Sequence, residues 1–203
     1  MSSGLLYDRF GHIDIYLFDQ FLRGRIVPGM RVVDMGCGTG RNLVHLLRDG
    51  YDVYATDREP EAVDAVRALA RGLAPALGAD HFRVEPVEQS SFADATFDVV
   101  ISNAVLHFAR DDAHFEAMVK EMWRVLRPGG LFFARLASSI GMADRMQPLG
   151  NSRYLMPDGS ERYLVDETTL MATTRRLGGR QLDPLKTTIV QDQRCMTTWV
   201  LER

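Results

Sequence analysis

Residues 32–42 read Val-Val-Asp-Met-Gly-Cys-Gly-Thr-Gly-Arg-Asn, an apolar run that ends in an acid and is followed by glycines at every second position. Apolar residues then recur at helical spacing at Leu43, Val44, Leu46 and Leu47. Glycine is needed where the backbone takes a positive φ or approaches a ligand with no Cβ in the way. The stretch therefore predicts a strand, a glycine loop and a helix, the arrangement with which doubly wound sheets bind nucleotides.

The spacing of these glycines differs from both common phosphate-binding motifs. A dinucleotide fingerprint, Gly-x-Gly-x-x-Gly, has its third glycine where this chain has Arg41, and a P-loop needs Gly-Lys-Ser/Thr where it has Gly40-Arg41-Asn42. The next predicted strand ends in Asp57, 17 residues after Gly40. A carboxylate at that place accepts hydrogen bonds from ribose hydroxyls. Together these features predict a site for an adenosine-like ribose, without a fitted place for a pyrophosphate.

This combination of an acid, a glycine loop and Asp57 resembles motif I and the acidic loop after it in the class I S-adenosylmethionine-dependent methyltransferases. The resemblance spans most of residues 30–136 and implies S-adenosylmethionine as the cofactor and S-adenosylhomocysteine as its product. Gly40-Arg41-Asn42 and the stretch 14–19 look closest to small bacterial methyltransferases of the tellurite-resistance type. The resemblance implies that the following residues bind the cofactor: Asp34, Gly36, Cys37, Gly38, Gly40, Asn42, Asp57, Arg58, Val87, Glu88 and Asn103.

The resemblance also assigns parts of the cofactor to these residues. The three loop glycines line its methionine part, and Asp34, under the loop, contacts its amino group directly or through water. Asp57 holds the ribose hydroxyls, and Arg58 flanks the adenine. The acid with which relatives bind adenine is missing here, so a backbone N–H of Val87 or Glu88, or the Glu88 carboxylate, is expected to meet the adenine.

The stretch Ser102–Phe108 resembles the motif that follows the fourth strand of the family, where residues back the methionine moiety and face the substrate. Alternatives stay open for its members. Asn103 is equally able to cap a turn, and His107, the best single candidate for a catalytic base, is equally able to be a core or hinge histidine. Arg41 and Asn42 either contact a ligand or only face solvent.

Absent motifs narrow the methyl acceptor. The prolines of an adenine-methylating loop are missing after Ser102, and no Pro-Cys nucleophile for cytosine is present. Because the net charge is −3, no nucleic-acid partner is predicted. Thiols, chalcogen oxyanions and similar soft nucleophiles are already partly ionised and need little acid–base help. The sequence predicts a small-molecule acceptor of this kind. The candidate contacts to this acceptor are Tyr16, Arg135, Arg145, Arg153 and Tyr154. For the arginines among them, the alternative is that they only face solvent.

Two other functions remain possible at this point. One is an NAD(P)-dependent oxidoreductase, which Arg41 in the place of a glycine and the missing Tyr-x-x-x-Lys motif oppose. The other is a non-catalytic module that binds S-adenosylmethionine without transferring its methyl group.

Composition sets the broad class. Hydrophobic residues make up 46% and charged residues 25% of the 203 positions, which suits a single globular domain, 1–203. Cys37 and Cys195 form neither a disulfide framework nor a metal-ligand pattern, so no metal is predicted. Apolar runs stay well short of the roughly 20 residues that span a bilayer, and Met1–Gly4 lacks signal-peptide features. We expect a cytoplasmic monomer or homodimer that does not bind membranes.

Strand and helix patterns alternate along the chain and predict an α/β fold. The expected architecture is a doubly wound, mostly parallel seven-stranded sheet with helices on both faces, the Rossmann-like fold of the methyltransferases. Its strands are predicted at residues 31–34, 52–57, 81–85, 97–102, 131–136, 185–190 and 195–202, with the last two as an antiparallel hairpin because their link is short. Helices are predicted at 13–24, after 43, from 60 to about 72, from 112 to 126 and from 167 to 177.

Two segments fall outside this alternation. Residues of about 5–27 are expected to form an N-terminal cap helix over the cofactor. The glycine- and proline-containing insertion at about 137–165 carries Arg-Tyr-Leu on both sides of Pro157-Asp158-Gly159, which predicts a small hairpin. We interpret this insertion as a lid over the substrate, since long irregular inserts at strand ends are commonly functional.

Overall fold

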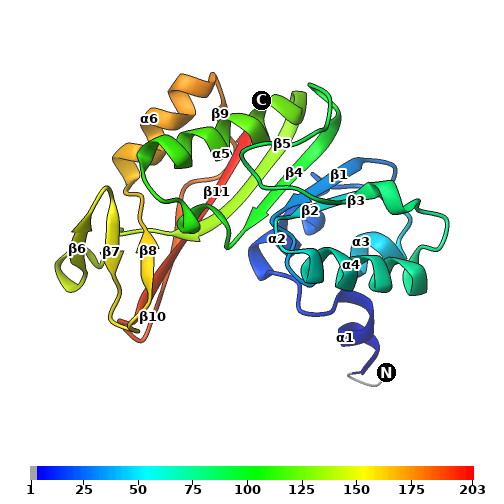
Figure 1. Ribbon diagram of the computed structural model, residues 1–203, viewed down its shortest axis with the longest axis horizontal. Coiled ribbons are helices and arrows are strands. Elements are labelled where there is room, and N and C mark those ends of the chain that lie inside the picture. Colours follow the sequence, from blue (N-terminus) through cyan, green and yellow to red (C-terminus); the bar gives the residue numbers. More distant parts are fainter. Residues whose placement is uncertain (1–3) are drawn as a thin grey trace.

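The computed structural model describes residues 4–203 (Figure 1). The predicted lack of a signal sequence rests on Met1–Gly4, and residues 1–3 of that stretch lie outside the described part. The main sheet is built from these strands: β1 (Arg31–Met35), β2 (Asp52–Asp57), β3 (Phe82–Val84), β4 (Phe97–Asn103), β5 (Leu126–Ala137), β9 (Arg180–Gln181), β10 (Lys186–Val190) and β11 (Arg194–Glu202).

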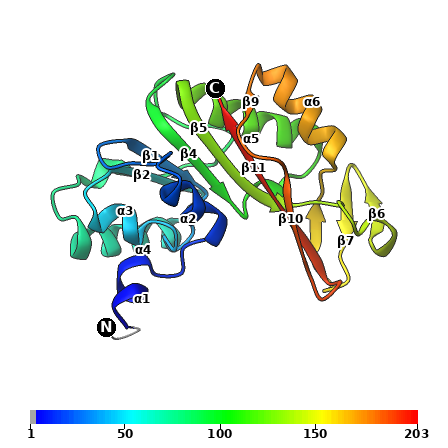
Figure 2. The ribbon, with the colours of Figure 1, turned by 180° about the vertical axis from the view of Figure 1, so that it is seen from behind.

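The strand order confirms the predicted fold. It runs β10-β11-β5-β4-β1-β2-β3, with the two-residue β9 added beside β11. Strands β1 to β5 pair in parallel, and β11 pairs antiparallel with both β5 and β10 (Figure 2). Because β1 lies between β2 and β4, the chain changes direction across the sheet at β1, and a crevice forms at the carboxyl ends of these strands.

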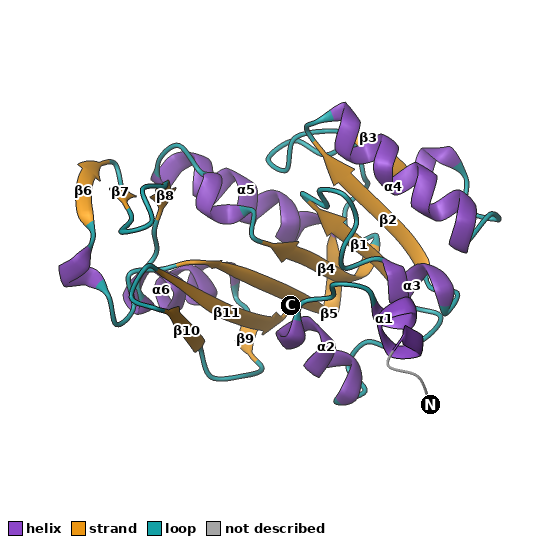
Figure 3. Ribbon diagram, turned by 90° about the horizontal axis from the view of Figure 1, so that it is seen from below, coloured by secondary structure: helices purple, strands orange, loops and turns teal. Residues whose placement is uncertain are grey.

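Helices cover both sides of this sheet (Figure 3). They are α1 (Gly4–Phe10), α2 (Ile15–Leu22), α3 (Val44–Arg48), α4 (Pro60–Leu73), α5 (Asp112–Val125) and α6 (Glu167–Leu177). Each helix within residues 4–203 is too short or too polar to cross a bilayer.

Alternation along the strands divides the core between the two faces. Val32 and Phe133 pack in the cluster with the apolar residues of α2, α3 and α4, while their neighbours Val33 and Phe132 pack in the cluster with α5 and α6. Successive side chains of a strand point to opposite faces. A sheet that is buried on both faces therefore needs the near-continuous apolar runs that the sequence shows.

Helix ends follow the predicted capping residues. Asp111 accepts a hydrogen bond from the His114 N–H at 2.8 Å at the start of α5, and Asp166 accepts one from the Thr169 N–H at 2.7 Å at the start of α6. Gly178 ends α6 in the left-handed conformation, with φ of +67°. These local predictions are confirmed because a cap needs only neighbouring residues.

Two element boundaries differ from the prediction. The predicted helix at 13–24 begins only at Ile15, because Asp14 takes the extended N-cap conformation and accepts hydrogen bonds from two backbone N–H groups; a separate α1 precedes it. Strand β5 begins at Leu126 rather than 131, so the Arg-Pro-Gly-Gly stretch at 127–130 lies within a strand, opposite a shift of register between Phe97 and Val99.

The predicted lid is a small antiparallel sheet that projects from the body at the end opposite the N-terminus (Figure 1). Its strands are β6 (Gln147–Gly150), β7 (Arg153–Leu155) and β8 (Glu161–Tyr163), of which β7 and β8 form the predicted hairpin. Tyr163 joins it to α5: its hydroxyl donates to Asp112 Oδ1 at 2.8 Å, and its ring stacks on Phe115 with centroids 5.1 Å apart. Tyr163 is thereby one of the contacts that hold this insertion against the body, beside the apolar cluster that Met146, Met156 and Leu164 form with Cys195.

We predict that Tyr163→Phe lowers the free energy of unfolding by about 1.5–3 kcal/mol, because it removes a hydrogen bond to a charged acceptor while keeping the ring stack. Urea unfolding followed by circular dichroism measures the change. Tyr154→Phe is the matched control, since Tyr154 lies on the neighbouring strand β7 and its hydroxyl has no hydrogen-bond partner among the described residues. Equal stability of the two variants would contradict the anchoring role of Tyr163.

Candidate functional site

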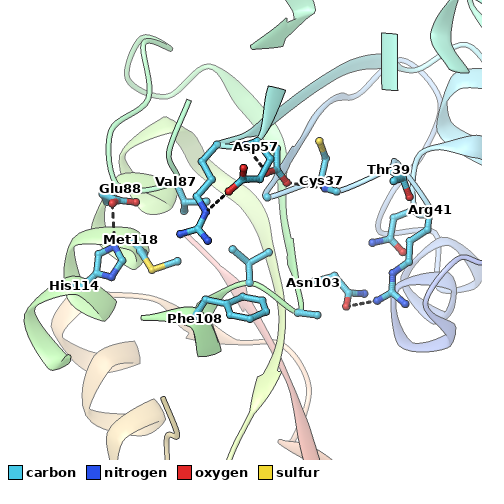
Figure 4. A pocket seen from close by; sticks show the side chains of 17 residues that line it. Cys37, Thr39, Arg41, Asp57, Val87, Glu88, Asn103, Phe108, His114 and Met118 are labelled. Carbon is cyan, nitrogen blue, oxygen red and sulfur yellow. Dashed lines mark hydrogen bonds and ion pairs between the residues drawn. The ribbon is translucent and has the colours of Figure 1, made fainter. Parts of the chain in front are cut away.

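A cavity of about 510 Å³ opens at the carboxyl ends of β1, β2 and β4 (Figure 4). It lies where the strand order predicts a ligand crevice. Its lining residues are Gly36, Cys37, Gly38, Thr39, Arg41, Asn42, Asp57, Arg58, Glu59, Val87, Glu88, Asn103, Ala104, Val105, Phe108, His114 and Met118.

The glycine loop after β1 forms one wall and is tied to the next strand. The N–H groups of Gly36 and Cys37 both donate to the Thr56 carbonyl, at 2.8 and 2.9 Å. Gly36 has a φ of +85°, and a Cβ there would lie 2.5 Å from Val105 Cγ2. Gly38 has a φ of +51°, but its Cβ would meet no atom within 4 Å, so the backbone is bare toward open space. Only glycine suits either position, for packing at the first and for access at the second.

Asp57 joins the two loops that face each other across the cavity. Its Oδ2 accepts a hydrogen bond from the Gly38 N–H at 2.8 Å, and its Oδ1 accepts one from the Glu59 N–H at 3.0 Å. Each carboxylate oxygen keeps further lone-pair capacity, since a carboxylate accepts about four hydrogen bonds. The carboxylate therefore has a fixed position and can accept further donors from a ligand.

Asp34 lies beneath the glycine loop and is 1% exposed. Neither of its carboxyl oxygens has a hydrogen-bond partner among the described residues. Burial raises the pKa of Asp34 to about 7, and the nearby Asp57 charge adds to this, while Arg41 and the Asn42 amide oppose it. A buried acid without a partner is costly unless a ligand or water supplies a donor.

At one end of the cavity, Glu88 is paired with a histidine from α5 (Figure 4). His114 Nε2 lies 3.0 Å from Glu88 Oε1, and His114 Nδ1 accepts a hydrogen bond from the Arg110 N–H at 3.1 Å. Burial alone would raise the pKa of Glu88, but a backbone N–H, His114 and Arg110 together lower it. Val87 and Met118 lie beside this pair and give the end an apolar surface.

At the other end, Arg41 and Asn103 meet across the mouth of the cavity (Figure 4). The Arg41 guanidinium donates to Asn103 Oδ1 at 2.8 Å. This contact joins the loop after β1 to the end of β4. The sequence leaves open whether Arg41 only faces solvent and whether Asn103 only caps a turn. In the structure, both residues line the cavity.

His107 is not among the residues that line the cavity, whereas its neighbour Phe108 is. Its Nδ1 accepts a hydrogen bond from the Ala137 N–H at 3.2 Å. Burial, with a smaller contribution from Arg162, lowers the pKa of His107 to about 4. In the neutral ring the proton then resides on Nε2, so neither nitrogen has a free lone pair with which to take a proton.

The five predicted acceptor contacts divide into two groups. Tyr16 and Arg135 lie together, with the guanidinium 5.2 Å from the ring centroid, and Arg135 pairs with Asp14 at 2.9 Å. The Asp14 N–H donates to Asn42 Oδ1 at 3.1 Å, which joins this group to the cavity wall. The other three, Arg145, Arg153 and Tyr154, belong to the lid insertion and do not line the cavity.

Sequence reasoning missed several residues that line the cavity. Phe108 ends the motif quoted after the fourth strand without a predicted role in the site, whereas His114 and Met118 lie on α5, where nothing in the local sequence points to a ligand. Met118 fits the helical spacing of the core face of α5, and it belongs to both the core cluster and the cavity wall. Within residues 4–203, no group of three or more His, Cys, Asp or Glu side chains is placed to hold a metal ion.

Comparison with known families decides the class of this site. Residues 33–134, half of the chain, match the family described as "Methyltransferase domain". The chain belongs to this family. The match spans the glycine loop, Asp57 and the end of β4, which are the parts that build the cavity. The oxidoreductase alternative is thereby excluded.

Relatives of this methyltransferase domain differ in what they are named for. Malonyl-[acyl-carrier protein] O-methyltransferase from Serratia marcescens is 32% identical over 126 residues, which are 62% of this chain and 44% of that protein. Arsenite methyltransferase from Aquipseudomonas alcaligenes is 28% identical over 131 residues, 60% of this chain and 37% of that protein. The chain thus spans about two fifths of the length of these curated relatives.

The fold is shared with solved methyltransferase structures. An S-adenosylmethionine-dependent methyltransferase from Methanosarcina mazei superposes with a TM-score of 0.73 at 20% identity, covering 90% of this chain and 96% of that one. These comparisons confirm the predicted fold, the class of S-adenosylmethionine-dependent methyltransferase domain and its cofactor. The likeness to the tellurite-resistance type stays a prediction.

The cavity residues fit S-adenosylmethionine on two independent observations. The open space beside Gly38 leaves backbone accessible to a ligand. Two predicted cofactor residues, Asp34 and Gly40, do not line the cavity, but the carboxyl of Asp34 beneath the loop lacks a donor, which an ammonium group could supply directly or through water. The residues that would hold the cofactor are those of the glycine loop, Asp57 and the Val87–Glu88 segment.

We predict that Gly38→Ala weakens binding of S-adenosylhomocysteine at least tenfold, because the new Cβ fills ligand space. Gly24→Ala is the matched control, since Gly24 also has a positive φ, +68°, and open space around its Cβ. Both variants should lose about 1–2 kcal/mol of stability from the left-handed backbone. Isothermal titration separates the two effects, and unchanged affinity in Gly38→Ala would contradict the assigned loop geometry.

Proposed function

We propose that this domain transfers a methyl group from S-adenosylmethionine to a small molecule with a soft nucleophilic atom, such as a thiol or a chalcogen oxyanion. The observation that carries this proposal is the state of the histidines. His114 Nδ1 accepts from the Arg110 N–H while its Nε2 lies 3.0 Å from the Glu88 carboxylate, and His107 lies off the cavity with its lone pair used. An acceptor that is already ionised or carries a free lone pair needs no base at this site.

The chain's own residues then act by binding and orientation. The glycine loop, Asp57 and Glu88 hold the cofactor at its tail, ribose and adenine, and Arg58 flanks the adenine. When bound, S-adenosylmethionine supplies an electrophilic methyl group on a sulfonium, which an acceptor lone pair displaces in line. Holding the two reactants in such a geometry lowers the barrier by replacing a bimolecular encounter with a positioned one.

The acceptor is proposed to lie between the cavity and the N-terminal cap. Tyr16 and Arg135 face this region through their links to Asn42, and the Arg135 charge is balanced by Asp14. Arg145, Arg153 and Tyr154 contact the acceptor only from the lid insertion, as part of its cover. Cys37, in the loop wall, is an unsuitable nucleophile because burial strongly raises its pKa.

Relatives supply both support and a competitor for this acceptor class. Arsenite, for which one relative is named, is a soft acceptor. A relative from Escherichia coli, 26% identical over 140 residues, is named tRNA 5-carboxymethoxyuridine methyltransferase. We propose that this chain does not act on nucleic acid, since its net charge is −3. The cytoplasmic location and a monomeric or homodimeric state are further parts of the proposal.

An acceptor panel tests the function directly. Purified protein is incubated with S-adenosylmethionine and, separately, with 2-mercaptoethanol, arsenite, tellurite, catechol, a primary amine and tRNA, and the S-adenosylhomocysteine formed is measured. Turnover with thiol or oxyanion is expected. Turnover only with the phenol, the amine or tRNA would overturn the acceptor class, and tight cofactor binding without any turnover would favour a non-catalytic module.

We predict that His107→Gln keeps kcat/KM for the best acceptor of this panel within about threefold, because His107 holds the Ala137 N–H and takes no part in proton transfer. Removal of a general base instead lowers the rate by about 10²–10⁴-fold. Steady-state kinetics with thermal unfolding as a folding control make the comparison. A loss in the larger range, in a folded variant, would restore His107 as the catalytic base.

Affinity for S-adenosylhomocysteine is predicted to rise about tenfold from pH 6 to pH 8. The pKa of Asp34 is raised to about 7, so its carboxyl is mostly protonated at pH 6 and mostly ionised at pH 8, where it attracts the ligand's ammonium group. The same shift makes the ligand-free protein lose stability between about pH 4 and pH 7, because over this range the Asp34 carboxyl is ionised in the unfolded chain while the buried carboxyl keeps its proton. Titration calorimetry across this range checks the slope, and Asp34→Asn should flatten it. A flat wild-type profile would contradict the role of Asp34.

A further inference from the structure

Arg162 of β8 connects the insertion to the wall of the cavity, and the proposed function gives it no role. Strand β8 lies against the 3₁₀ turn Leu106–Phe108 that follows β4. The Arg162 guanidinium lies over the Phe108 ring, with Cζ 5.0 Å from the ring centroid. Phe108 lines the cavity and is 52% exposed (Figure 4). Arg162 therefore stands at the rim of the cavity, on the side of the insertion.

The charge of Arg162 is available to a ligand, in contrast to that of the other arginines in the insertion. Arg145 is paired with Asp192, and Arg153 is paired with Glu161. Within residues 4–203, Arg162 forms no ion pair with a carboxylate, and its Nη1 donates to the Glu161 carbonyl at 2.8 Å. Because a guanidinium has five N–H donors, most of those of Arg162 remain for another acceptor.

The surroundings of Arg162 hold its charge close to the cavity. An aromatic ring attracts a cation within about 6 Å of its centroid without using the N–H donors of that cation. The charge also reaches the residue before Phe108: burial is the main reason that the pKa of His107 falls to about 4, and Arg162 adds to this. Arg162 is half-buried, so salt screens its charge less than that of an exposed arginine.

We propose that Arg162 is a specificity-determining residue that selects acceptors with a negative charge on or beside the atom that is methylated. Charge-assisted hydrogen bonds from arginine to an oxyanion are among the strong ones in proteins, so a sulfonate or an inorganic oxyanion suits this position. The inference rests on the proposed function and deepens it, because it takes the cavity as the place of methyl transfer. Arg162 contacts the charged group of the acceptor, so its effect is expected in KM.

The first experiment compares two thiols that differ in charge. With S-adenosylmethionine saturating, kcat and KM are measured for 2-mercaptoethanesulfonate and for 2-mercaptoethanol. We expect the wild-type protein to prefer the sulfonate at least tenfold in kcat/KM. Arg162→Met keeps an unbranched side chain against Phe108 but removes the charge. It should raise KM for the sulfonate at least tenfold, with kcat within twofold, and change KM for 2-mercaptoethanol less than twofold.

Two further variants separate the charge from other effects. Arg162→Lys keeps the positive charge and should lose no more than threefold of the preference. Arg48→Met is the matched control, since Arg48 is an exposed arginine of α3 outside the cavity, and it should change neither KM. Affinity for S-adenosylhomocysteine, measured by titration calorimetry, should stay within twofold in all three variants if the cavity is intact.

The second experiment repeats the comparison with acceptors that lack a thiol. Near pH 7 tellurite is an anion, whereas arsenite is mainly the neutral acid. The ratio of kcat/KM for tellurite to that for arsenite should fall at least fivefold in Arg162→Met and be kept in Arg162→Lys.

Two outcomes overturn selection by Arg162. One is a ratio of charged to uncharged acceptor that is the same in the wild-type protein and in a folded Arg162→Met. The other is an equal loss for both members of a pair, which would indicate that Arg162 only packs against Phe108. A wild-type protein that binds S-adenosylhomocysteine but methylates none of the four acceptors would instead refute the proposed function, so the two failures are distinguishable.

Discussion

The hydrogen bond from the Gly38 N–H to Asp57 Oδ2 is the contact on which the geometry of the site depends. It joins the loops after β1 and β2 beside the crevice at the carboxyl ends of the strands, where the strand order changes direction. The N–H groups of Gly36 and Cys37 add two further bonds to the Thr56 carbonyl, so the glycine loop is fixed along its length rather than free to sample other conformations. A rigid loop presents its bare backbone at no further entropic cost on binding.

Much of the fold and of the cavity wall could be predicted from the sequence, because these features are set by interactions between residues that are close together in the chain. A glycine that needs a positive φ, an aspartate that caps the next helix and apolar alternation along a strand act within a few residues of their own position. Asp111 and Asp166 cap the helices that their spacing predicts, and Asp57 ends the strand that was expected to carry it. The family resemblance covers residues 30–136, which include these features except the Asp166 cap. In this range the family motif and the local physical chemistry therefore predict the same elements.

The remainder depends on contacts between distant segments. His114 meets Glu88 only because α5 packs back over the sheet, and its sequence position gives no sign of that. Strand β6 contains Pro148, which cannot donate to a ladder, and it forms only as the edge of a sheet whose other strands are already paired. His107 looked equally suited to catalysis and to the core, and the Ala137 N–H that occupies its lone pair is 30 residues away. Such partners are set by topology.

Asp14 shows how the N-terminal helices are joined to the cavity wall. One carboxylate oxygen caps α2, the other pairs with Arg135, and its backbone N–H bonds to Asn42 on the cavity wall. Asp14 thus fixes the start of α2, balances the positive charge of Arg135 and orients the side-chain amide of Asn42. Because the pair is buried, removal of either charge leaves the other uncompensated, which is far more damaging than loss of a surface pair. The start of α2 is therefore tied both to the cavity wall, through Asn42, and to the main sheet, through Arg135.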